Sequence, residues 1–357
     1  MKPFTKLLSI LLIAAFLMAA VSAPAFAQEK KQFKLAWSIY VGWMPWGWAS
    51  DQGIVKKWAD KYGIEIEVVQ FNDYIESINQ YTAGAFDGVT ATNMDTLAIP
   101  SVGGIDTTAL IVGDFSNGND AIILKDKTKL ADIKGQPVNL VELSVSHYLL
   151  ARGLGSLGMS ERDVQVINTS DADLVAAYST PDVTALVTWN PLVAEIMGMP
   201  GANKVFDSSD IPGEIIDLTV VNTDTLAANP AFGKALTGAW YETMQIMSSD
   251  TPAGKAARAA MGSASGTDLA GYEAQLAATK MFYAAKDASA LAVSAELPKT
   301  MDMVRGFLFD HGLLGEGAPS ADVVGIAFPD GKILGDKGNV KFRFDTSYMD
   351  LAAKDEL

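Results

Sequence analysis

The sequence predicts an α/β protein with two lobes, each built as a sheet flanked by helices. Three observations carry this prediction: strands alternate with helices, the alternation occurs twice, and 357 residues exceed what one core usually holds. No linker rich in Pro, Gly or Ser separates the two sets. The crossings are therefore predicted to be two strands, near residues 115–122 and 217–223. The predicted lobes are residues 30–118 with 223–357, and residues 119–222.

In the first set, short runs with strand spacing alternate with segments of helical spacing that have caps and glycine stops. Pro45 suits the first turn of one helix, and Asp73 caps the next. The predicted strands are residues 33–38, 64–71, 86–91 and 107–114, and the predicted helices are 45–63, 73–84 and 93–104.

The second set repeats this pattern, and a long helical region follows it. A tail with Gly and Pro punctuation closes the chain, and GKILGDKGNVKFRF within it predicts a hairpin. The predicted strands are residues 119–125, 137–142, 163–168, 183–189 and 216–222, the helices are 144–158, 171–179 and 190–198, residues 223–312 are mostly helical, and the tail is 313–357.

The first 27 residues have the pattern of a secretory signal peptide. A basic start, MKPFTK, precedes the apolar run LLSILLIAAFLMAAV, and Ala25-Phe26-Ala27 suits signal peptidase. Cleavage after Ala27 would export the chain to the periplasm. The chain contains no cysteine, so we expect neither disulfides nor a lipid-anchored N-terminal cysteine. We expect a monomer that is free of the membrane.

The charge balance excludes several partner classes. The chain has 42 acidic and 27 basic residues, a net charge of −15 at pH 7. Such a surface repels nucleic acid and anionic membrane, and it mildly favours a cationic ligand. We therefore expect no nucleic-acid partner.

Motifs for cofactors and metals are weak. Gly153, Gly155 and Gly158 have dinucleotide-loop spacing, but they close a helix rather than open one, so no nucleotide is predicted. The only two histidines, His147 and His311, fall in different segments, and no Cys accompanies them. We predict no metal and no cofactor. His147 is expected to cap a helix or contact a ligand, and His311 to serve a helix dipole.

Ligands of such folds bind beyond the carboxyl ends of strands, where loops and helix N-termini converge. Aromatic, acidic and small polar side chains follow the predicted strands there. Tryptophans are conspicuous after the first strand, in LAWSIYVGWMPWGWASDQG. The predicted ligand-binding residues are Trp43, Trp46, Asn93, Asp95, Glu142, Ser144, Ser146, His147, Trp189, Asn190 and Asp217.

Some of these residues have an alternative, structural explanation, and the charged ones among them are acidic. Asp95, Ser144 and Asn190 are also good helix caps, and Trp48 and Trp58 fit a core better than a site. Helix N-termini alone attract anions, usually with an Arg or Lys nearby. The strand ends carry no basic residue but several acids, including Glu214 beside those named above. Acids between indole faces predict a site for a small planar cation.

Three segments resemble a known family. YTAGAFDGVTATNMDTL, LADIKGQPVNLVELSVSHYLLARGLGSLGM and ALVTWNPLVAEI are similar to the periplasmic solute-binding proteins of ABC importers in the nitrate, sulfonate and taurine group. The resemblance covers about residues 33–250. It is strongest to a branch associated with urea carboxylase. Glu142 and Leu143 depart from the anion-binding members, which often have a small or basic residue before the Ser-rich helix start.

The resemblance implies the periplasmic binding protein fold, in which two lobes joined by two strands close over a solute. It also implies delivery of the solute to an ABC permease in the inner membrane. Because the associated carboxylases act on urea and guanidine, guanidinium is the first expected ligand and urea the second. The alternatives are a nitrate-, sulfonate- or taurine-type anion, and an enzyme of the pyrimidine-precursor type on the same fold. We expect no enzyme, since His147 is the sole candidate base.

Overall fold

The computed structural model describes residues 30–315 and 317–357. The predicted signal peptide and its cleavage after Ala27 lie outside these residues. Residues 31–357 form one compact unit. No helix in the described part of the chain is long and apolar enough to cross a membrane.

The larger sheet collects strands from both ends of the chain. Their order is β13-β12-β14-β4-β10-β3-β1-β2, and β11 pairs with β4 outside this path. β1 runs parallel to β2 and β3, as connections through helices require. The strands are β1 (Gln32–Ser38), β2 (Glu65–Phe71), β3 (Gly88–Thr92), β4 (Thr107–Ser116), β10 (Ile216–Asn222), β11 (Thr279–Met281), β12 (Gly325–Ala327), β13 (Ile333–Leu334) and β14 (Val340–Phe344).

Helices cover this sheet and bury its apolar side chains. The longest, α10, places Phe232 in a stack with Phe33 of β1, and the ring centroids are 4.5 Å apart. Asp73 caps α4, as predicted, by accepting from the backbone N–H of Glu76. The helices are α2 (Met44–Asp51), α3 (Ile54–Lys61), α4 (Tyr74–Thr82), α5 (Asn93–Thr96), a π-helical turn (Leu97–Ser101), α9 (Thr223–Ala228), α10 (Pro230–Met247), α11 (Pro252–Ala264), α12 (Leu269–Ala277), α13 (Ala285–Ala292), α14 (Leu297–Asp310) and α15 (Ser347–Ala353).

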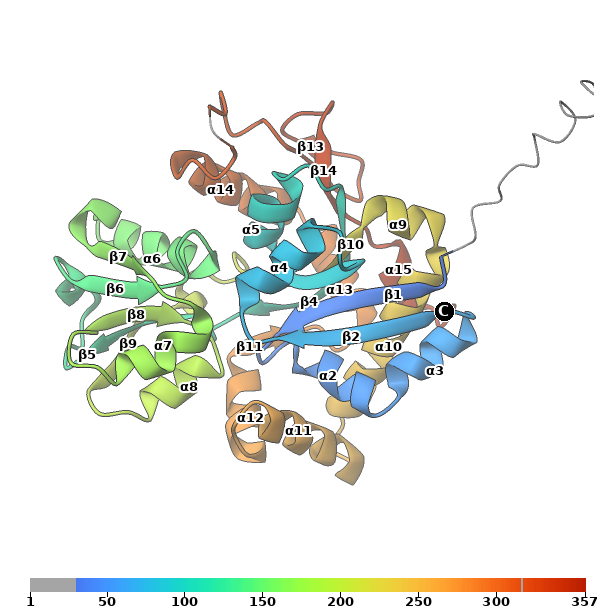
Figure 1. Ribbon diagram of the computed structural model, residues 1–357, viewed down its shortest axis with the longest axis horizontal. Coiled ribbons are helices and arrows are strands. Elements are labelled where there is room, and N and C mark those ends of the chain that lie inside the picture. The colour runs from blue at the N-terminus through green and yellow to red at the C-terminus, as the bar shows by residue number, and fades with distance from the viewer. Residues whose placement is uncertain (1–29, 316) are drawn as a thin grey trace, which may run out of the picture. The chain divides into compact units, whose positions relative to one another are not determined.

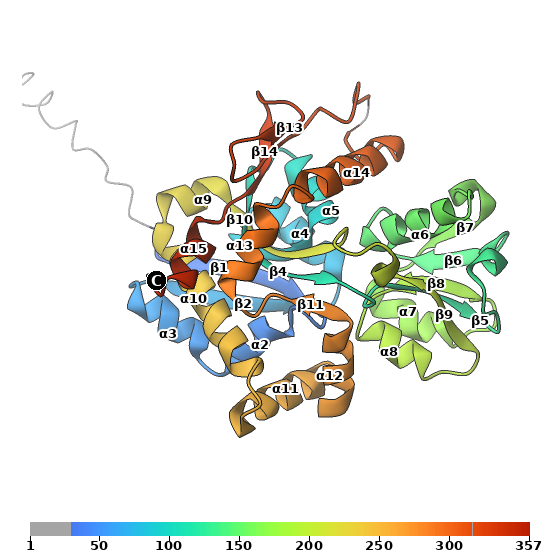
Figure 2. The same cartoon turned by 180° about the vertical axis from the view of Figure 1, so that it is seen from behind.

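The smaller sheet has the order β7-β6-β8-β5-β9. Figures 1 and 2 show α6 on one face of this sheet and α7 and α8 on the other. Its strands are β5 (Ala121–Lys125), β6 (Pro137–Leu140), β7 (Gln165–Asn168), β8 (Ala185–Thr188) and β9 (Ala202–Asp207). Its helices are α6 (Val145–Ser156), α7 (Asp171–Tyr178) and α8 (Leu192–Met197), with 3-10 turns at Leu130–Ile133, Glu161–Asp163 and Ser208–Asp210.

The chain passes between the two sheets twice. It leaves the larger sheet after β4, forms the smaller sheet from β5 to β9, and returns as β10. Both sheets are mixed, because β10 runs antiparallel to β3 and β4, and β5 runs antiparallel to β8 and β9. The return strand thus lies in the middle of the larger sheet, next to the end of the outgoing strand.

Several predicted elements differ from the structure. The single helix predicted over 45–63 is two helices, because Gly53 adopts a left-handed φ of 72° between them. The predicted hairpin in residues 331–344 is wrong. β13 and β14 do not pair with each other, because β12 lies between them, antiparallel to β13 and parallel to β14. β9, β11 and α15 were not predicted.

Candidate functional site

A small cavity lies between residues that belong to the two sheets. The atom-free space around it is about 250 Å³ including open solvent, but only about 10 Å³ of this has room for the centre of a water molecule, so the lining residues lie close together. The loop after β1, the start of α4 and the end of β3 approach it from the larger sheet. The start of α6 and the end of β8 approach it from the smaller sheet, and both crossings contribute. The lining residues are Tyr40, Trp43, Tyr74, Thr92, Asp120, Val145, Trp189, Ile215 and Asp217.

Hydrogen bonds between the two sides close the structure around this cavity. The indole Nε1 of Trp189 donates to the carbonyl of Ile39 at 3.2 Å. The hydroxyl of Ser170, before α7, donates to the Asp73 carboxylate, before α4, at 2.7 Å. Such contacts join loops that lie far apart in the sequence. A solute in the cavity would therefore be enclosed by both sides.

The central strands of the larger sheet place two carboxyl groups side by side. Asp217 of β10 lies opposite Asp114 of β4 on one side and opposite Thr92 of β3 on the other. The Tyr40 hydroxyl donates to Asp114 Oδ1 at 2.9 Å. Oδ2 of Asp114 and Oδ2 of Asp217 are both buried without a hydrogen-bond partner. Each strand of the pair thus brings one under-compensated carboxyl group to the cavity region.

Two further carboxyl groups lie at the outgoing crossing and at the N-terminus of α5. Ser116 donates its hydroxyl to Asp120 Oδ2 at 2.5 Å. Asp95 Oδ2 accepts from the hydroxyls of Tyr74 and Thr92, at 2.8 and 2.9 Å. Asp95 Oδ1 is buried and has no hydrogen-bond partner. Asp95 is thus held by two cavity-lining residues, although it does not itself line the cavity.

Burial shifts the titration of all four groups upward. It raises the pKa of Asp95 to about 6. It raises the pKa of Asp114 to about 7. Burial, with the negative charges of Asp95 and Asp207, raises the pKa of Asp120 to about 7. Burial, and then the charges of Asp114 and Asp120, raises the pKa of Asp217 well above its usual range. None of the described lining residues is basic, so the chain itself supplies no cation to this cavity.

Aromatic rings form a continuous part of the wall. Tyr40 and Trp43 meet edge to face with centroids 5.0 Å apart. Trp43 and Tyr74 are 5.5 Å apart, and Tyr74 and Trp189 are also 5.5 Å apart. The indole Nε1 of Trp43 is buried and has no partner. The site therefore combines aromatic surface with carboxyl groups, and it keeps one unused donor.

The sequence-predicted residues divide by location. Trp43, Trp189 and Asp217 line the cavity, and Asp95 bonds to its wall. Trp46 lies in the core, where its Nε1 donates to Thr219 Oγ1 at 3.1 Å and its ring packs on Trp240. These placements separate the neighbouring indoles, because Trp43 precedes α2 whereas Trp46 turns with the helix onto the sheet.

Three other predicted residues have structural partners. Asn93 accepts from the backbone N–H of Ile216 at 3.1 Å and donates to the carbonyl of Glu214. Ser144 caps α6 by accepting from Ser146 N–H at 3.2 Å. Asn190 donates to Asn119 Oδ1 at 2.7 Å and accepts from the N–H of Ala194. These side chains position the loops and the crossings around the cavity.

The remaining three predicted residues lie in or near the start of α6. Glu142 is exposed and is not among the described residues that line the cavity. The Ser146 hydroxyl is buried without a partner. His147 Nδ1 accepts from the backbone N–H of Leu143 at 3.2 Å, and burial lowers the pKa of His147 to about 4. His147 faces His311 and Glu161 rather than the cavity.

Sequence reasoning did not select several cavity residues. Tyr74 opens a helix, which usually indicates packing. Asp114 and Asp120 flank the outgoing crossing. The predicted acids came instead from the ends of other strands and from the return strand. One signal was present: GDFSNGND places two acids around a predicted crossing without any basic residue. The lining residues not selected are Tyr74, Thr92, Asp120, Val145 and Ile215, and Asp114, which bonds to the lining residue Tyr40, was not selected either.

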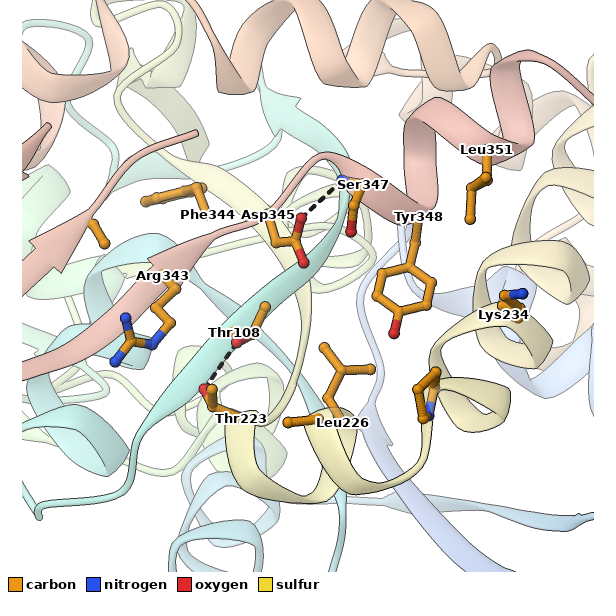
Figure 3. A pocket seen from close by; sticks show the side chains of 13 residues that line it. Thr108, Thr223, Leu226, Lys234, Arg343, Phe344, Asp345, Ser347, Tyr348 and Leu351 are labelled. Carbon is orange, nitrogen blue, oxygen red and sulfur yellow. Dashed lines mark hydrogen bonds between the residues drawn. The ribbon is translucent and has the colours of Figure 1, made fainter. Parts of the chain in front are cut away.

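A larger groove lies elsewhere, between β4, β14, α9, α10 and α15. Figure 3 shows Leu226 and Tyr348 pointing towards each other across it. The empty space is about 1070 Å³. Its arginine, Arg343, already pairs with Asp106 at 2.6 Å. The Thr108 and Thr223 hydroxyls bond to each other at 2.8 Å. Arg343, Thr108 and Thr223 of this groove thus have partners, in contrast to the unpaired carboxyl oxygens near the cavity.

Comparison with known proteins places this architecture in a family. Residues 27–262 match the NMT1-like family, which is more than half of the chain. The chain belongs to the NMT1-like family. The relatives named below are binding proteins, in agreement with the prediction that this NMT1-like protein is not an enzyme.

Curated relatives are similar over part of their length. A Brucella abortus (strain 2308) protein named as a binding protein is 28% identical over 164 residues, 45% of this chain and 49% of that one. The taurine-binding periplasmic protein of Escherichia coli K12 is 23% identical over 140 residues, 38% of this chain and 43% of that one. The chain therefore spans about half the length, or less, of the curated relatives it matches.

Solved structures show the same fold. The alkanesulfonate-binding protein of Xanthomonas axonopodis pv. citri superposes with a TM-score of 0.66 at 17% identity, covering 81% of this chain and 96% of that one. The periplasmic nitrate-binding protein of Synechocystis PCC 6803 gives a TM-score of 0.57 at 14% identity, covering 91% and 99%. The predicted two-lobed periplasmic binding protein fold is thereby confirmed. The lobe boundaries and the resemblance to a urea- or guanidine-related branch stay predictions.

Proposed function

We propose that this NMT1-like protein is the periplasmic solute-binding subunit of an ABC importer and that it captures a small planar, nitrogen-rich solute, with the cation guanidinium as the first candidate and neutral urea as the second. One observation carries the choice of charge. Asp95, Asp114, Asp120 and Asp217 are buried around one small cavity, and none of its described lining residues is basic. These acids, without a basic residue in the described lining, favour a cationic solute over a neutral or anionic one.

The electrostatic argument follows from the cost of burial. A buried carboxylate without a counter-charge is unfavourable, so it takes up a proton instead. The raised pKa values of Asp114 and Asp120, both about 7, express this cost in the empty site. A cation that replaces those protons restores the ionised state and gains charge-assisted hydrogen bonds. An anion would add to the charge already present.

Guanidinium suits both the carboxyl groups and the aromatic rings of the cavity wall. It stays protonated at all working pH values, since the pKa of a guanidinium lies above about 12. Its N–H groups point outward in one plane, where Asp120 and Asp217 line the cavity, and its faces suit indole rings such as Trp43 and Trp189. Two charge-assisted bonds of about 1.5–3 kcal/mol each, with stacking terms of about 0.5–2 kcal/mol, approach the roughly −8 kcal/mol of micromolar binding.

The enclosed position suits a binding protein that closes over its solute. Residues from both sheets and from both crossings surround the cavity. We propose residues 30–118 with 223–357 as one lobe and residues 119–222 as the other, closing by a hinge at the crossings. The closed form would present the loaded protein to an ABC permease in the inner membrane. We also propose export after cleavage at Ala27, and a monomeric state without nucleic-acid or membrane contacts of its own.

Urea is the second candidate, and Trp43 favours it. The Trp43 indole N–H is a buried donor without a partner. Urea offers a carbonyl oxygen that could accept from it, whereas guanidinium has no acceptor. Yet neutral urea leaves the carboxyl groups without a counter-charge, which is the larger electrostatic term.

The relatives' names point to a different ligand class. Taurine and alkanesulfonate carry a sulfonate, which would meet the carboxyl groups of Asp120 and Asp217 here. At these identities the neighbours establish the fold and leave the ligand open. The acids of the cavity are our reason for favouring a cation.

Calorimetry with a panel of solutes tests this proposal. Guanidinium, urea, nitrate and taurine would be titrated into the exported chain at pH 7.5. We expect guanidinium to bind in the micromolar range or tighter, urea more weakly, and nitrate and taurine without measurable heat. Tighter binding of urea would mean that the Trp43 indole N–H, rather than the carboxyl groups, determines which solute binds. Tighter binding of either anion would refute the cationic site.

A further inference from the structure

The only two histidines of the chain meet in space, although 163 residues separate them in the sequence. His147 lies in the first turn of α6, and His311 is the C-terminal cap of α14. Their ring centroids are 5.3 Å apart. Glu161, in the 3-10 turn Glu161–Asp163, completes the group. In both ribbon views the end of α14 lies next to α6 (Figures 1 and 2).

We propose that His147, Glu161 and His311 form a binding site for a late first-row divalent metal ion, with Zn²⁺ as the ion it fits best. One ligand atom from each residue lies within 4.8 Å of the others. Two imidazoles and one carboxylate are an established ligand set for Zn²⁺, with water in the fourth position. Among the described residues, this is the only group of three or more His, Cys, Asp or Glu side chains so arranged.

The distances require little adjustment. His311 Nε2 is 2.6 Å and His147 Nε2 is 3.9 Å from the same Glu161 oxygen. Tetrahedral zinc with bonds of about 2.0–2.1 Å places its ligand atoms about 3.3 Å apart. The two observed separations lie on either side of this value. Each of these two nitrogen–oxygen separations would change by less than 1 Å, and the ligand atoms of the two histidines already lie within 4.8 Å of each other.

The partners of the rings favour metal at the Nε2 atoms. His311 Nδ1 lies 2.8 Å from the carbonyl of Phe307, to which Nδ1–H donates, whereas Nε2 meets Glu161 Oε1 at 2.6 Å, so a metal ion would replace the hydrogen between Nε2 and the carboxylate. His147 Nε2 is buried without a hydrogen-bond partner, and the side chain is only 6% exposed. Glu161 and His311 are each about a quarter exposed, which leaves a path for the ion and its water.

One bond must change for His147 to bind metal through Nε2. Its Nδ1 accepts from the N–H of Leu143 at 3.2 Å, whereas a metal-bound neutral imidazole carries its proton on Nδ1. Leu143 is exposed and sits in a loop with φ of 62°, so its N–H can turn to water. The loss of one long hydrogen bond is small against a new metal–nitrogen bond.

The position of the group gives the ion a role in closure. His147 and Glu161 belong to the smaller sheet, and His311 follows a helix that packs on α5 of the larger sheet side. An ion held by all three stabilises the closed arrangement in which they meet. By linkage, zinc and solute then each raise the affinity for the other by the same factor. This coupling rests on the proposed solute-binding function, whereas the metal site itself does not.

Calorimetric titration of the chelator-treated, dialysed chain with zinc sulfate alone tests the site. We expect one ion per chain. His147→Asn, His311→Asn and Glu161→Gln should each weaken binding at least tenfold. Asparagine keeps an oxygen near the Nδ1 position of His147 or an amide donor near that of His311, which protects the fold. Glu142→Gln and Asp310→Asn, beside the group in sequence, should change affinity less than twofold. Equal zinc binding by the three variants and the wild type would overturn the site.

A second readout uses the fact that the chain has two histidines. The ring nitrogen resonances of His147 and His311 should both shift on addition of one equivalent of zinc. A shift of one ring alone, or of neither, would contradict the three-residue site. Zinc at saturation should then strengthen guanidinium binding at least threefold in the wild type and leave it unchanged in Glu161→Gln. Zinc binding without this change would refute the coupling, and absence of guanidinium binding would refute only the proposed function.

Discussion

Asp106 precedes β4, and Asp114 lies near the other end of that strand. The surroundings of Asp106 stabilise its ionised form, whereas those of Asp114 disfavour it. Arg343, which lines the groove of Figure 3, donates to both oxygens of Asp106 at 2.8 and 2.6 Å. Partial burial opposes ionisation, but the bonds from Arg343 and Thr223 lower the pKa of Asp106 below its usual range. Burial raises the pKa of Asp114 to about 7, and no basic side chain lines the described cavity nearby.

The contrast shows that the protein supplies a counter-charge at one end of β4, whereas no basic residue lines the described cavity at the other. At the first end the carboxylate of Asp106 is part of an ion pair with Arg343. At the other end the buried carboxyl groups can avoid the cost of ionisation by taking up a proton, or, as we propose, by pairing with a cationic solute. Size alone would favour the groove over the cavity, whereas charge compensation selects the cavity. Substitutions at the two ends should therefore have opposite effects.

Neutralising one cavity carboxyl group should have the largest effect. Asp120→Asn and Asp217→Asn should each weaken guanidinium binding about 10- to 100-fold, because each removes a charge-assisted bond of about 1.5–3 kcal/mol. The same changes should raise the free energy of unfolding of the solute-free protein at pH 7.5, since the penalty of ionising a buried acid disappears. Calorimetry and denaturant unfolding measure the two quantities.

Asp106→Asn is the matched control for these variants. It should leave guanidinium affinity within twofold and lower the free energy of unfolding, because it breaks the pair with Arg343. If Asp106→Asn weakened binding as much as Asp120→Asn, the distinction between the two ends of β4 would fail.

The pH dependence should also differ between the two ends. Guanidinium must displace protons from groups such as Asp114 and Asp120, whose pKa values are about 7. Below that value the affinity should fall by about tenfold per pH unit for each proton displaced. Titrations at pH 5.5, 6.5 and 7.5 should therefore show steadily tighter binding. A flat profile would mean that the carboxyl groups are already ionised, or that the solute is not a cation.

The free energy of unfolding should also depend on pH through the cavity acids. The folded-state pKa of each cavity acid lies above its unfolded value, so its contribution is fully present below about pH 4 and is lost as pH rises through about 6–7. The solute-free protein should lose stability over this range, and saturating guanidinium should cancel the loss. Asp106 has a lowered pKa, so its contribution is present above the unfolded value and is lost only in acid. Thermal unfolding across pH 4–8, with and without guanidinium, separates the two trends.

The tryptophans give a smaller contrast of the same kind. Trp189→Phe should weaken guanidinium binding about three- to tenfold, because phenylalanine offers a poorer face to a cation and loses the bond to Ile39. Trp46→Phe should leave affinity nearly unchanged but lower stability, since it removes the bond to Thr219 and leaves space beside Trp240. Equal loss of affinity in both variants would mean that the indoles act through the fold alone.

The sequence predicts the fold well where local signals are strong. The strand at residues 33–38 and the helix capped by Asp73 lie within a residue or two of the observed elements. The hairpin at 331–344 fails because its two strands pair with β12, which a local pattern cannot reveal. The β9 strand was missed because it lies in a stretch punctuated by Pro and Gly, MGMPGANKVFD.

The candidate site is predictable in kind but only partly in detail. Acids and indoles at strand ends predict a cation site, and Trp43, Trp189 and Asp217 indeed line one cavity. Sequence cannot tell Trp43 from Trp46, because the turn into α2 decides which indole faces the cavity and which the core. Nor can it pair Asp114 with Asp217, since that depends on the register between β4 and the return strand β10. Strand pairing between distant parts of the chain thus decides which acids come together at the site.

The smallest effect is expected at the finished ion pair. Arg343→Lys keeps the positive charge beside Asp106 but loses the two-pronged contact, since an ammonium cannot match both carboxylate oxygens at once. The pair is partly exposed, so the loss should be only about 0.5–1 kcal/mol of stability. Guanidinium affinity and its pH profile should not change, because the groove and the cavity lie at opposite ends of β4. Denaturant unfolding and calorimetry on this variant would show whether the two ends act independently; a change in solute affinity would mean that the groove belongs to the binding machinery after all.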